Sequence, residues 1–305
     1  MIYQVNKKKI SNGEIIAYRE TGKDLKEKEP TLILIHGNQS SSLFYEHLMK
    51  DFEDRAYIVA IDMAGFGEST YKNSHIKIKD WADDVALFMD EMKISNGVVV
   101  GWSAGGGTAL ELAANYRDKV NHLVLLASVG VNGFLLPKRT EDLTPIDGEF
   151  LYKREDVIKD PAIMIPITRA IENKNTAFLH NIWGNTIFNL YPPNEEDFNA
   201  YMKEIIKERC FVDISVALCQ FNITHEKKVV EGSGKISDIV CPVTWIHGKK
   251  DLVVPFFTGE ESIEYFEREK ILIPIEDAGH ASFMDQPELF NEILENIINK
   301  QRRKL

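Results

Sequence analysis

Ser103 is the residue of this sequence best placed to act as a nucleophile. It lies between Gly101 and Gly105 at the spacing G-x-S-x-G, directly after the valine run 98–100. A serine in a tight turn between a strand and a helix takes a strained backbone conformation, and residues without side chains two positions away leave room for that turn. The turn would raise the hydroxyl above the sheet and direct the amide of Ala104 toward a developing oxyanion. The alternative interpretation is a glycine-rich loop that contains an incidental serine.

A serine hydroxyl becomes a good nucleophile when an imidazole accepts its proton and a carboxylate orients that imidazole. His280 is the best candidate base among the eight histidines, because it follows the last expected strand and comes directly after a glycine. Asp251 is the best candidate acid, because it follows another buried strand in the pattern G-x-x-D that begins at Gly248. The other strand end that could supply an acid carries Ser128, which favours Asp251.

The backbone amides of Asn38 and Ala104 are the candidates for an oxyanion hole. Asn38 follows the apolar run 32–35, and Gly37 frees its amide to face the site. Amides held in place before the reaction stabilise negative charge as it develops on a carbonyl oxygen. His36 and His247 also stand at strand ends, and we interpret both as structural.

The elements that must position these residues alternate between strand and helix. An Asn-Gly turn at 12–13 predicts a hairpin between strands near 3–5 and 15–19. Continuous apolar runs predict strands buried on both faces at 32–35, 57–61, 98–100, 123–127, 240–246 and 271–275. Apolar residues at helical spacing predict helices at 42–52, 81–92, 104–116, 260–268 and from 287 onward. Such a succession predicts an α/β fold, in which sites form at the carboxyl ends of the strands.

The alternation stops between residues 131 and 236. This stretch has helical patterns and recurring aromatic residues but no convincing buried strand. We therefore expect a core made of residues 1–130 and 237–305, with a helical cap inserted at 131–236. The best helix in the insertion should start after Asn194, where three acidic residues occupy the first turn.

Composition narrows the possible partners. The formal net charge of −11 disfavours nucleic acid, whose phosphates need a basic face. Three cysteines cannot all pair, no metal-ligand spacing is present, and no apolar run is long enough to span a bilayer. These features favour a protein of a reducing compartment, and we expect it in the cytoplasm, with no metal and no membrane span.

The chain resembles the α/β-hydrolase-fold superfamily of serine hydrolases. Five motifs carry the resemblance: His36–Gly37–Asn38, Asp62-x-x-Gly65-x-Gly67-x-Ser69, the segment 101–106, Gly248-x-x-Asp251 and Gly279–His280. The resemblance implies an eight-stranded, mostly parallel sheet flanked by helices, with a helical cap after the sixth strand. It also implies a Ser103–Asp251–His280 triad and no cofactor.

Three functions are compatible with these residues. The first is a serine hydrolase that cleaves carboxylic esters of small to medium apolar acyl groups through an acyl-enzyme, with a small-molecule ester as substrate. The second is a carbon–carbon bond hydrolase that uses the same triad. The third is a small-molecule receptor that binds without turnover, which a complete triad disfavours. Motifs around Asn38 and Ser103 differ from those of several specialised subfamilies, which leaves a generic carboxylesterase.

Overall fold

The computed structural model describes residues 3–303, and its central element is a sheet of eight strands within that range. The strands are β1 (Asn6–Lys9), β2 (Ile15–Thr21), β3 (Thr31–Ile35), β4 (Tyr57–Ile61), β5 (Gly97–Trp102), β6 (Val120–Leu126), β9 (Val243–Gly248) and β10 (Lys270–Ile275). Their order across the sheet is β1-β2-β4-β3-β5-β6-β9-β10. β2 is antiparallel to both of its neighbours, and the strands β4, β3, β5, β6, β9 and β10 of this sheet are parallel to one another. The predicted α/β class with a mostly parallel sheet is confirmed.

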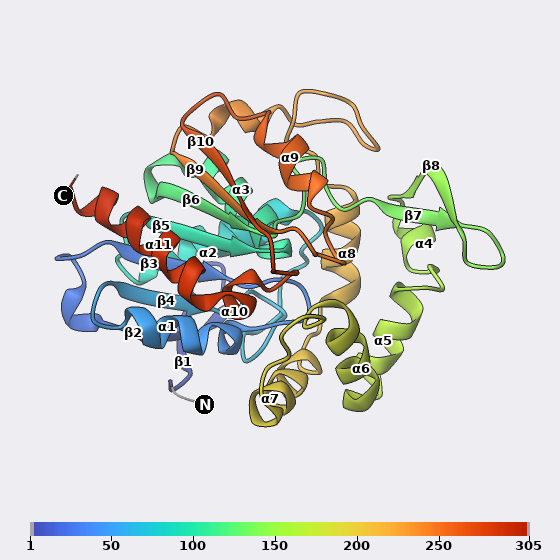
Figure 1. The fold of residues 1–305 in the computed structure, drawn as a ribbon, viewed down its shortest axis with the longest axis horizontal. Helices are drawn as coiled ribbons and strands as arrows, with labels where there is room; N and C mark the ends of the chain where they lie inside the picture. Colours follow the sequence, from blue (N-terminus) through green and yellow to red (C-terminus); the bar gives the residue numbers. More distant parts are fainter. Residues whose placement is uncertain (1–2, 304–305) are drawn as a thin grey trace.

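Helices cover both faces of this sheet (Figure 1). The core helices are α1 (Glu46–Phe52), α2 (Ile78–Glu91), α3 (Ala104–Asn115), α9 (Phe257–Ile263), α10 (Ser282–Asp285) and α11 (Pro287–Arg302). Short 3₁₀ turns are η1 (Lys23–Leu25), η2 (Ser42–Tyr45), η3 (Arg117–Lys119) and η4 (Lys235–Asp238). The long helix α11 begins with Pro287 at its first position, where the missing N–H costs nothing.

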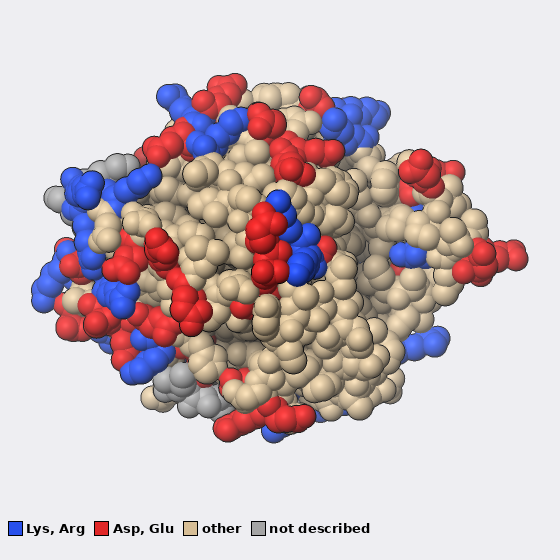
Figure 2. Space-filling model, in the orientation of Figure 1, with Lys and Arg blue, Asp and Glu red and all other residues tan. Residues whose placement is uncertain are grey.

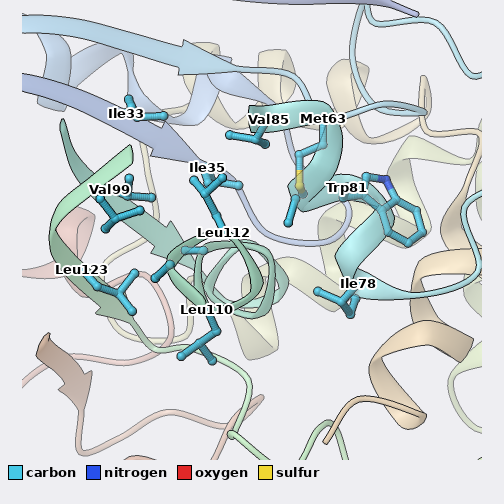
Figure 3. Close-up of a cluster of buried hydrophobic side chains, with 14 of the residues drawn as sticks. Ile33, Ile35, Met63, Ile78, Trp81, Val85, Val99, Leu110, Leu112 and Leu123 are labelled. Carbon is cyan, nitrogen blue, oxygen red and sulfur yellow. The ribbon is translucent and has the colours of Figure 1, made fainter. Parts of the chain in front are cut away.

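The alternation of side chains along β3 explains why both faces need cover. Ile33 and Ile35 point into one apolar cluster, with Trp81 and Val85 of α2 and with α3, as Figure 3 shows. Leu32 and Leu34 point the other way, into a cluster with α1 and α11. Successive strand residues face opposite sides of a sheet, so a strand that is apolar throughout must be covered on both.

The segment between β6 and β9 forms an insertion that lies over the carboxyl ends of the strands (Figure 1). Its helices are α4 (Arg154–Val157), α5 (Met164–Glu172), α6 (Thr176–Thr186), α7 (Glu195–Ile205) and α8 (Phe211–Cys219). Its two ends meet in a neck, where the Ile223 amide donates to the Val131 carbonyl at 2.9 Å.

The insertion is not purely helical, which corrects the expectation from the sequence. It opens with a hairpin of β7 (Leu136–Arg139) and β8 (Pro145–Leu151), which projects from the body of the molecule in Figure 1. Most of β8 is exposed, so it lacks the apolar run by which a buried strand is recognised.

The first strand also lies further along the chain than predicted. β1 covers Asn6–Lys9, whereas the expected strand was at 3–5. Lys7 and Lys9 point to solvent and alternate with half-buried neighbours. Charged lysines on a strand at the edge of a sheet oppose pairing with another chain.

Acidic and basic side chains are intermixed on the face drawn in Figure 2. Opposite charges often pair, as Lys207 does with Glu68 at 2.9 Å. Across residues 3–303, no helix combines the length and apolar character needed to cross a bilayer.

Candidate active site

Ser103 occupies the turn between β5 and α3 in a backbone conformation that few residues tolerate. Its φ is 54° and its ψ is −119°, a strained combination for a residue with a side chain. The chain folds back tightly there, because a Cβ on Gly101 would lie 2.4 Å from the Gly105 carbonyl oxygen. A Cβ on Gly105 would lie 2.3 Å from the carbonyl oxygen of Ile35 in β3. Both glycines of the motif are therefore required by close backbone approach.

His280 and Asp251 form a buried hydrogen-bonded pair. The distance between His280 Nδ1 and Asp251 Oδ2 is 2.8 Å. Asp251 follows β9 and His280 follows β10, so two adjacent parallel strands bring their ends together. Trp102, the residue before Ser103, donates from Nε1 to the His280 carbonyl at 2.9 Å. The end of β5, which precedes Ser103, thus holds the loop that carries the imidazole.

The surroundings of Asp251 keep it ionised. Burial alone would raise the pKa of its carboxyl, but the charge of His280 and hydrogen bonds from His247 and His280 hold that pKa well below its ordinary value. Its Oδ1 accepts from the amides of Val253 and Val254 at 2.8 and 2.9 Å. An ionised carboxylate can only accept, so His280 donates from Nδ1 and its Nε2 is left to accept a proton.

Two side chains fix the peptide between Gly37 and Asn38. His36 accepts at Nε2 from the Met63 amide at 3.0 Å, so its Nδ1 carries the proton and donates to the Gly37 carbonyl at 2.7 Å. Burial lowers the pKa of His36 to about 4, which keeps the imidazole neutral. Ser40 Oγ also donates to the Gly37 carbonyl, at 2.8 Å. Since a trans peptide points its C=O and N–H in opposite directions, the Asn38 N–H points away from this buried pair.

Ser103, His280, Asn38 and Ala104 all line one cavity of about 280 Å³. Gly37 also lines the cavity and lies close to Ser103. A Cβ on Gly37 would lie 3.0 Å from Ser103 Cβ. Most of its walls are apolar side chains from the insertion: Phe134, Leu136, Ile163, Met164, Ile167, Ile182, Trp183, Ile187, Phe211 and Leu218. Among the described residues that line it, none is Lys, Arg, Asp or Glu. The cavity therefore suits a neutral, apolar molecule.

The structure adds polar groups that the sequence analysis does not single out. Ser215 of α8 accepts from Asn38 Nδ2 at 3.4 Å and links the roof of the cavity to its floor. His247, interpreted as structural, also lies 3.2 Å from Asp251 Oδ2. Asp285 accepts from the amide of Gly279 at 2.7 Å, directly before His280. The short spacing between His247 and Asp251 could have indicated their contact from the sequence. The contact between Asn38 and Ser215 joins distant segments, and no sequence pattern indicates it.

A metal site is not part of this arrangement. Within the range 3–303, no group of three or more His, Cys, Asp or Glu side chains is arranged to hold a metal ion. Cys210, Cys219 and Cys241 are buried free thiols.

Comparison with known proteins places the fold. The model of the alpha/beta hydrolase fold family matches residues 30–287. An AB hydrolase superfamily protein of Bacillus subtilis (YisY) is 21% identical over 272 residues, which cover 88% of this chain and 91% of that protein. Putative esterase/lipase 1 of Mycoplasma pneumoniae is 22% identical over 267 residues, with 87% and 88% covered. An esterase from Exiguobacterium antarcticum superposes with a TM-score of 0.73 at 18% identity and covers 97% of this chain and 100% of its own.

Proposed function

The chain belongs to the alpha/beta hydrolase fold family, and from that premise we propose that it is a serine hydrolase of carboxylic esters. Its substrates would carry small to medium apolar acyl groups and would be cleaved through an acyl-enzyme. The observation that carries the proposal is the His280–Asp251 pair at 2.8 Å beside a strained Ser103 that lines the same cavity.

In this mechanism each of the three side chains has one task. Ser103 Oγ attacks the ester carbonyl carbon while His280 Nε2 accepts the hydroxyl proton. Asp251 holds the imidazole in the tautomer with Nδ1 protonated and stabilises the imidazolium that forms. His280 then gives the proton to the departing alcohol, and a water molecule activated by the same imidazole hydrolyses the acyl-serine.

The backbone amides of Asn38 and Ala104 would form the oxyanion hole. Ala104 is the first residue of α3, where an N–H has no acceptor within the helix. The Asn38 N–H belongs to the peptide whose carbonyl is held by His36 and Ser40, so its direction is fixed before substrate binds. Donors fixed in advance stabilise the tetrahedral intermediate without reorganisation.

Labelling and turnover with a Ser103→Ala variant test this function. A fluorophosphonate probe should label the wild type at Ser103 and leave the variant unlabelled. The wild type should also hydrolyse p-nitrophenyl esters, and the variant should lose several orders of magnitude in kcat, on the order of 10⁶ if the three residues act as a unit. Labelling that persists in Ser103→Ala refutes the nucleophile. Turnover of vinylogous diketones in preference to esters would favour carbon–carbon hydrolysis, and binding without any turnover would favour a receptor.

A further inference from the structure

Glu208, in the linker between α7 and α8, is a buried acid that the proposed mechanism does not use. Only 5% of the residue is exposed. Burial raises the pKa of its carboxyl well above the ordinary glutamate value, against the opposing effects of the Gln39 backbone and the Arg209 charge. Within the part of the chain that the structure describes, neither carboxyl oxygen has a hydrogen-bond partner of good geometry. Because an unpaired buried carboxylate is very costly, burial favours the neutral acid, which has one O–H to donate.

Arg209, the neighbour of Glu208, fastens the linker between α7 and α8 to the loop after β4. The Arg209 guanidinium donates to the carbonyl oxygens of Phe66 and Ser69. The Arg209 amide donates to the Gly65 carbonyl at 2.8 Å. These bonds hold the linker, and with it the backbone of Glu208, against the loop after β4.

Gln39 follows Asn38 in the chain, and its backbone N–H lies against the Glu208 carboxyl. Its φ is 53°, a left-handed conformation that costs a residue with a side chain roughly 1–2 kcal/mol and needs support from its surroundings. Its amide donates to Asn38 Oδ1 at 3.0 Å, so its conformation and that of Asn38 are coupled. Its side-chain oxygen Oε1 is buried and, among the described residues, has no donor. Gln39 Oε1 and both Glu208 carboxyl oxygens are thus buried without a hydrogen-bond partner among the described residues, on two residues that contact each other.

We propose that Glu208 is a positioning residue whose carboxylic O–H donates to Gln39 Oε1. This bond holds Gln39 in its left-handed conformation and thereby keeps the Asn38 amide aimed into the cavity. The inference rests on the proposed function, in which the Asn38 amide belongs to the oxyanion hole. Its acid–amide contact, however, exists in the resting protein and can be observed without catalysis.

Three variants of Glu208 and Gln39 test the effect on catalysis. Glu208→Met removes the donor and should lower kcat about tenfold to hundredfold with KM within about twofold, since a displaced oxyanion donor weakens the transition state. Glu208→Gln restores a donor and should recover most of kcat. In a Gln39→Gly background, which needs no support for a positive φ, adding Glu208→Met should cost less than about threefold. Glu204→Met is the matched control, because Glu204 is equally buried in α7 but pairs with Lys207, and its kcat should stay within about threefold of wild type.

Infrared spectroscopy tests the acid itself in the resting protein. The spectrum at pH 7 should contain the C=O stretch of a protonated carboxylic acid, absent in Glu208→Gln and shifted to higher frequency in Gln39→Gly, where its acceptor is lost. If Glu208→Gln removes no such band, or Gln39→Gly leaves it unshifted, the inference is wrong, whether or not the protein hydrolyses esters. Equal losses of kcat in Glu208→Met and Glu208→Gln would also overturn it. An inactive wild type with the expected spectra would refute the proposed function and leave the acid–amide contact standing.

Discussion

At the scale of single residues, the pKa values of the two carboxyls near His280 are shifted in opposite directions. Asp251 accepts four hydrogen bonds or close N–H contacts and stays ionised. Asp285 accepts from the amide of Gly279, and its Oδ1 has no partner among residues 3–303. Burial raises the pKa of Asp285 to about 6, helped by the negative charge of Asp251 and opposed by Gly279 and His280. We therefore test Asp251 through its effect on catalysis and Asp285 through its effect on the pH dependence of stability.

Replacing Asp251 by Asn should leave the fold intact and lower kcat by roughly 10⁴, because the amide favours the wrong tautomer of His280. The measurement is steady-state hydrolysis of one p-nitrophenyl ester, with circular dichroism to verify the fold. A matched control is Asp277→Asn, a surface carboxylate on the loop that carries His280, where it pairs with Lys250. A loss below tenfold in Asp251→Asn would mean that another group orients the imidazole.

Replacing Asp285 by Asn should change how stability depends on pH. A carboxyl whose pKa is raised in the folded state stabilises the protein at low pH, and this contribution disappears as the pH rises through about 6. The free energy of unfolding of the wild type should therefore fall relative to Asp285→Asn between pH 4 and pH 7.5, by about 1–2 kcal/mol after allowance for solvent. Urea unfolding at three pH values measures this. A constant difference between the two proteins would contradict it.

At the scale of elements, the insertion shares its apolar core with the sheet. Phe44 of η2 stacks on Tyr201 of α7 with ring centroids 4.2 Å apart. Trp183 of α6 contacts Trp102 at the end of β5 with centroids 6.4 Å apart. The side chains that roof the cavity are thus held by the same cluster that covers one face of the sheet.

This roof predicts a preference for longer acyl chains. Each methylene that enters the apolar cavity adds about 0.8 kcal/mol, so kcat/KM should rise about fourfold per methylene from acetyl toward butyryl or hexanoyl until the cavity is full. Succinyl esters should be poor substrates, because no lining residue within the described range is Lys or Arg. A series of acetyl, butyryl, hexanoyl, decanoyl and succinyl esters on one leaving group decides the matter. A clear preference for acetyl or succinyl would refute an apolar acyl site.

The elements that the sequence reveals best are those with the strongest periodicity. β3 and β4 are continuous apolar runs, and α11 repeats its apolar residues at helical spacing, so both kinds were predictable. The hairpin of β7 and β8 was not predictable, because β8 carries Asp147, Gly148 and Glu149 in its middle, and strands disfavour these residues. The order of motifs sufficed to nominate Ser103, Asp251 and His280. The contact between Glu208 and Gln39 joins segments far apart in the chain, and no local pattern encodes it.

At the scale of the whole molecule, a buried ion pair ties three segments together at the edge of the sheet. His75 Nε2 lies 2.8 Å from Asp84 Oδ2 in α2. Asn12, in the turn between β1 and β2, donates to Asp84 Oδ1 at 2.6 Å. Burial tends to lower the pKa of His75, but the hydrogen bond and charge of Asp84 raise it above the ordinary histidine value.

Breaking this pair should destabilise the protein in a pH-dependent way. A histidine with a raised pKa contributes stability that is fully present below its ordinary pKa of about 6.5 and is lost as the pH rises through the raised value. Asp84→Asn should therefore cost about 2–4 kcal/mol at pH 6 and less at pH 9, since removing one partner strands the buried charge of the other. Urea unfolding at both values measures the cost. An equal loss at pH 6 and pH 9 would show that His75 is neutral throughout.

The neck between Val131 and Ile223 has a consequence for how such a protein can diversify. Because those two backbone groups are bonded to each other, the residues between them form a closed excursion whose ends lie together. The entropy of closing a loop grows only slowly with length, by about 0.6 kcal/mol for each doubling. The chain entropy of lengthening or shortening this excursion is therefore small, as long as the apolar contacts that it makes with the sheet are kept. The residues that form the walls of the cavity can therefore change while the strands that hold Ser103, Asp251 and His280 stay the same.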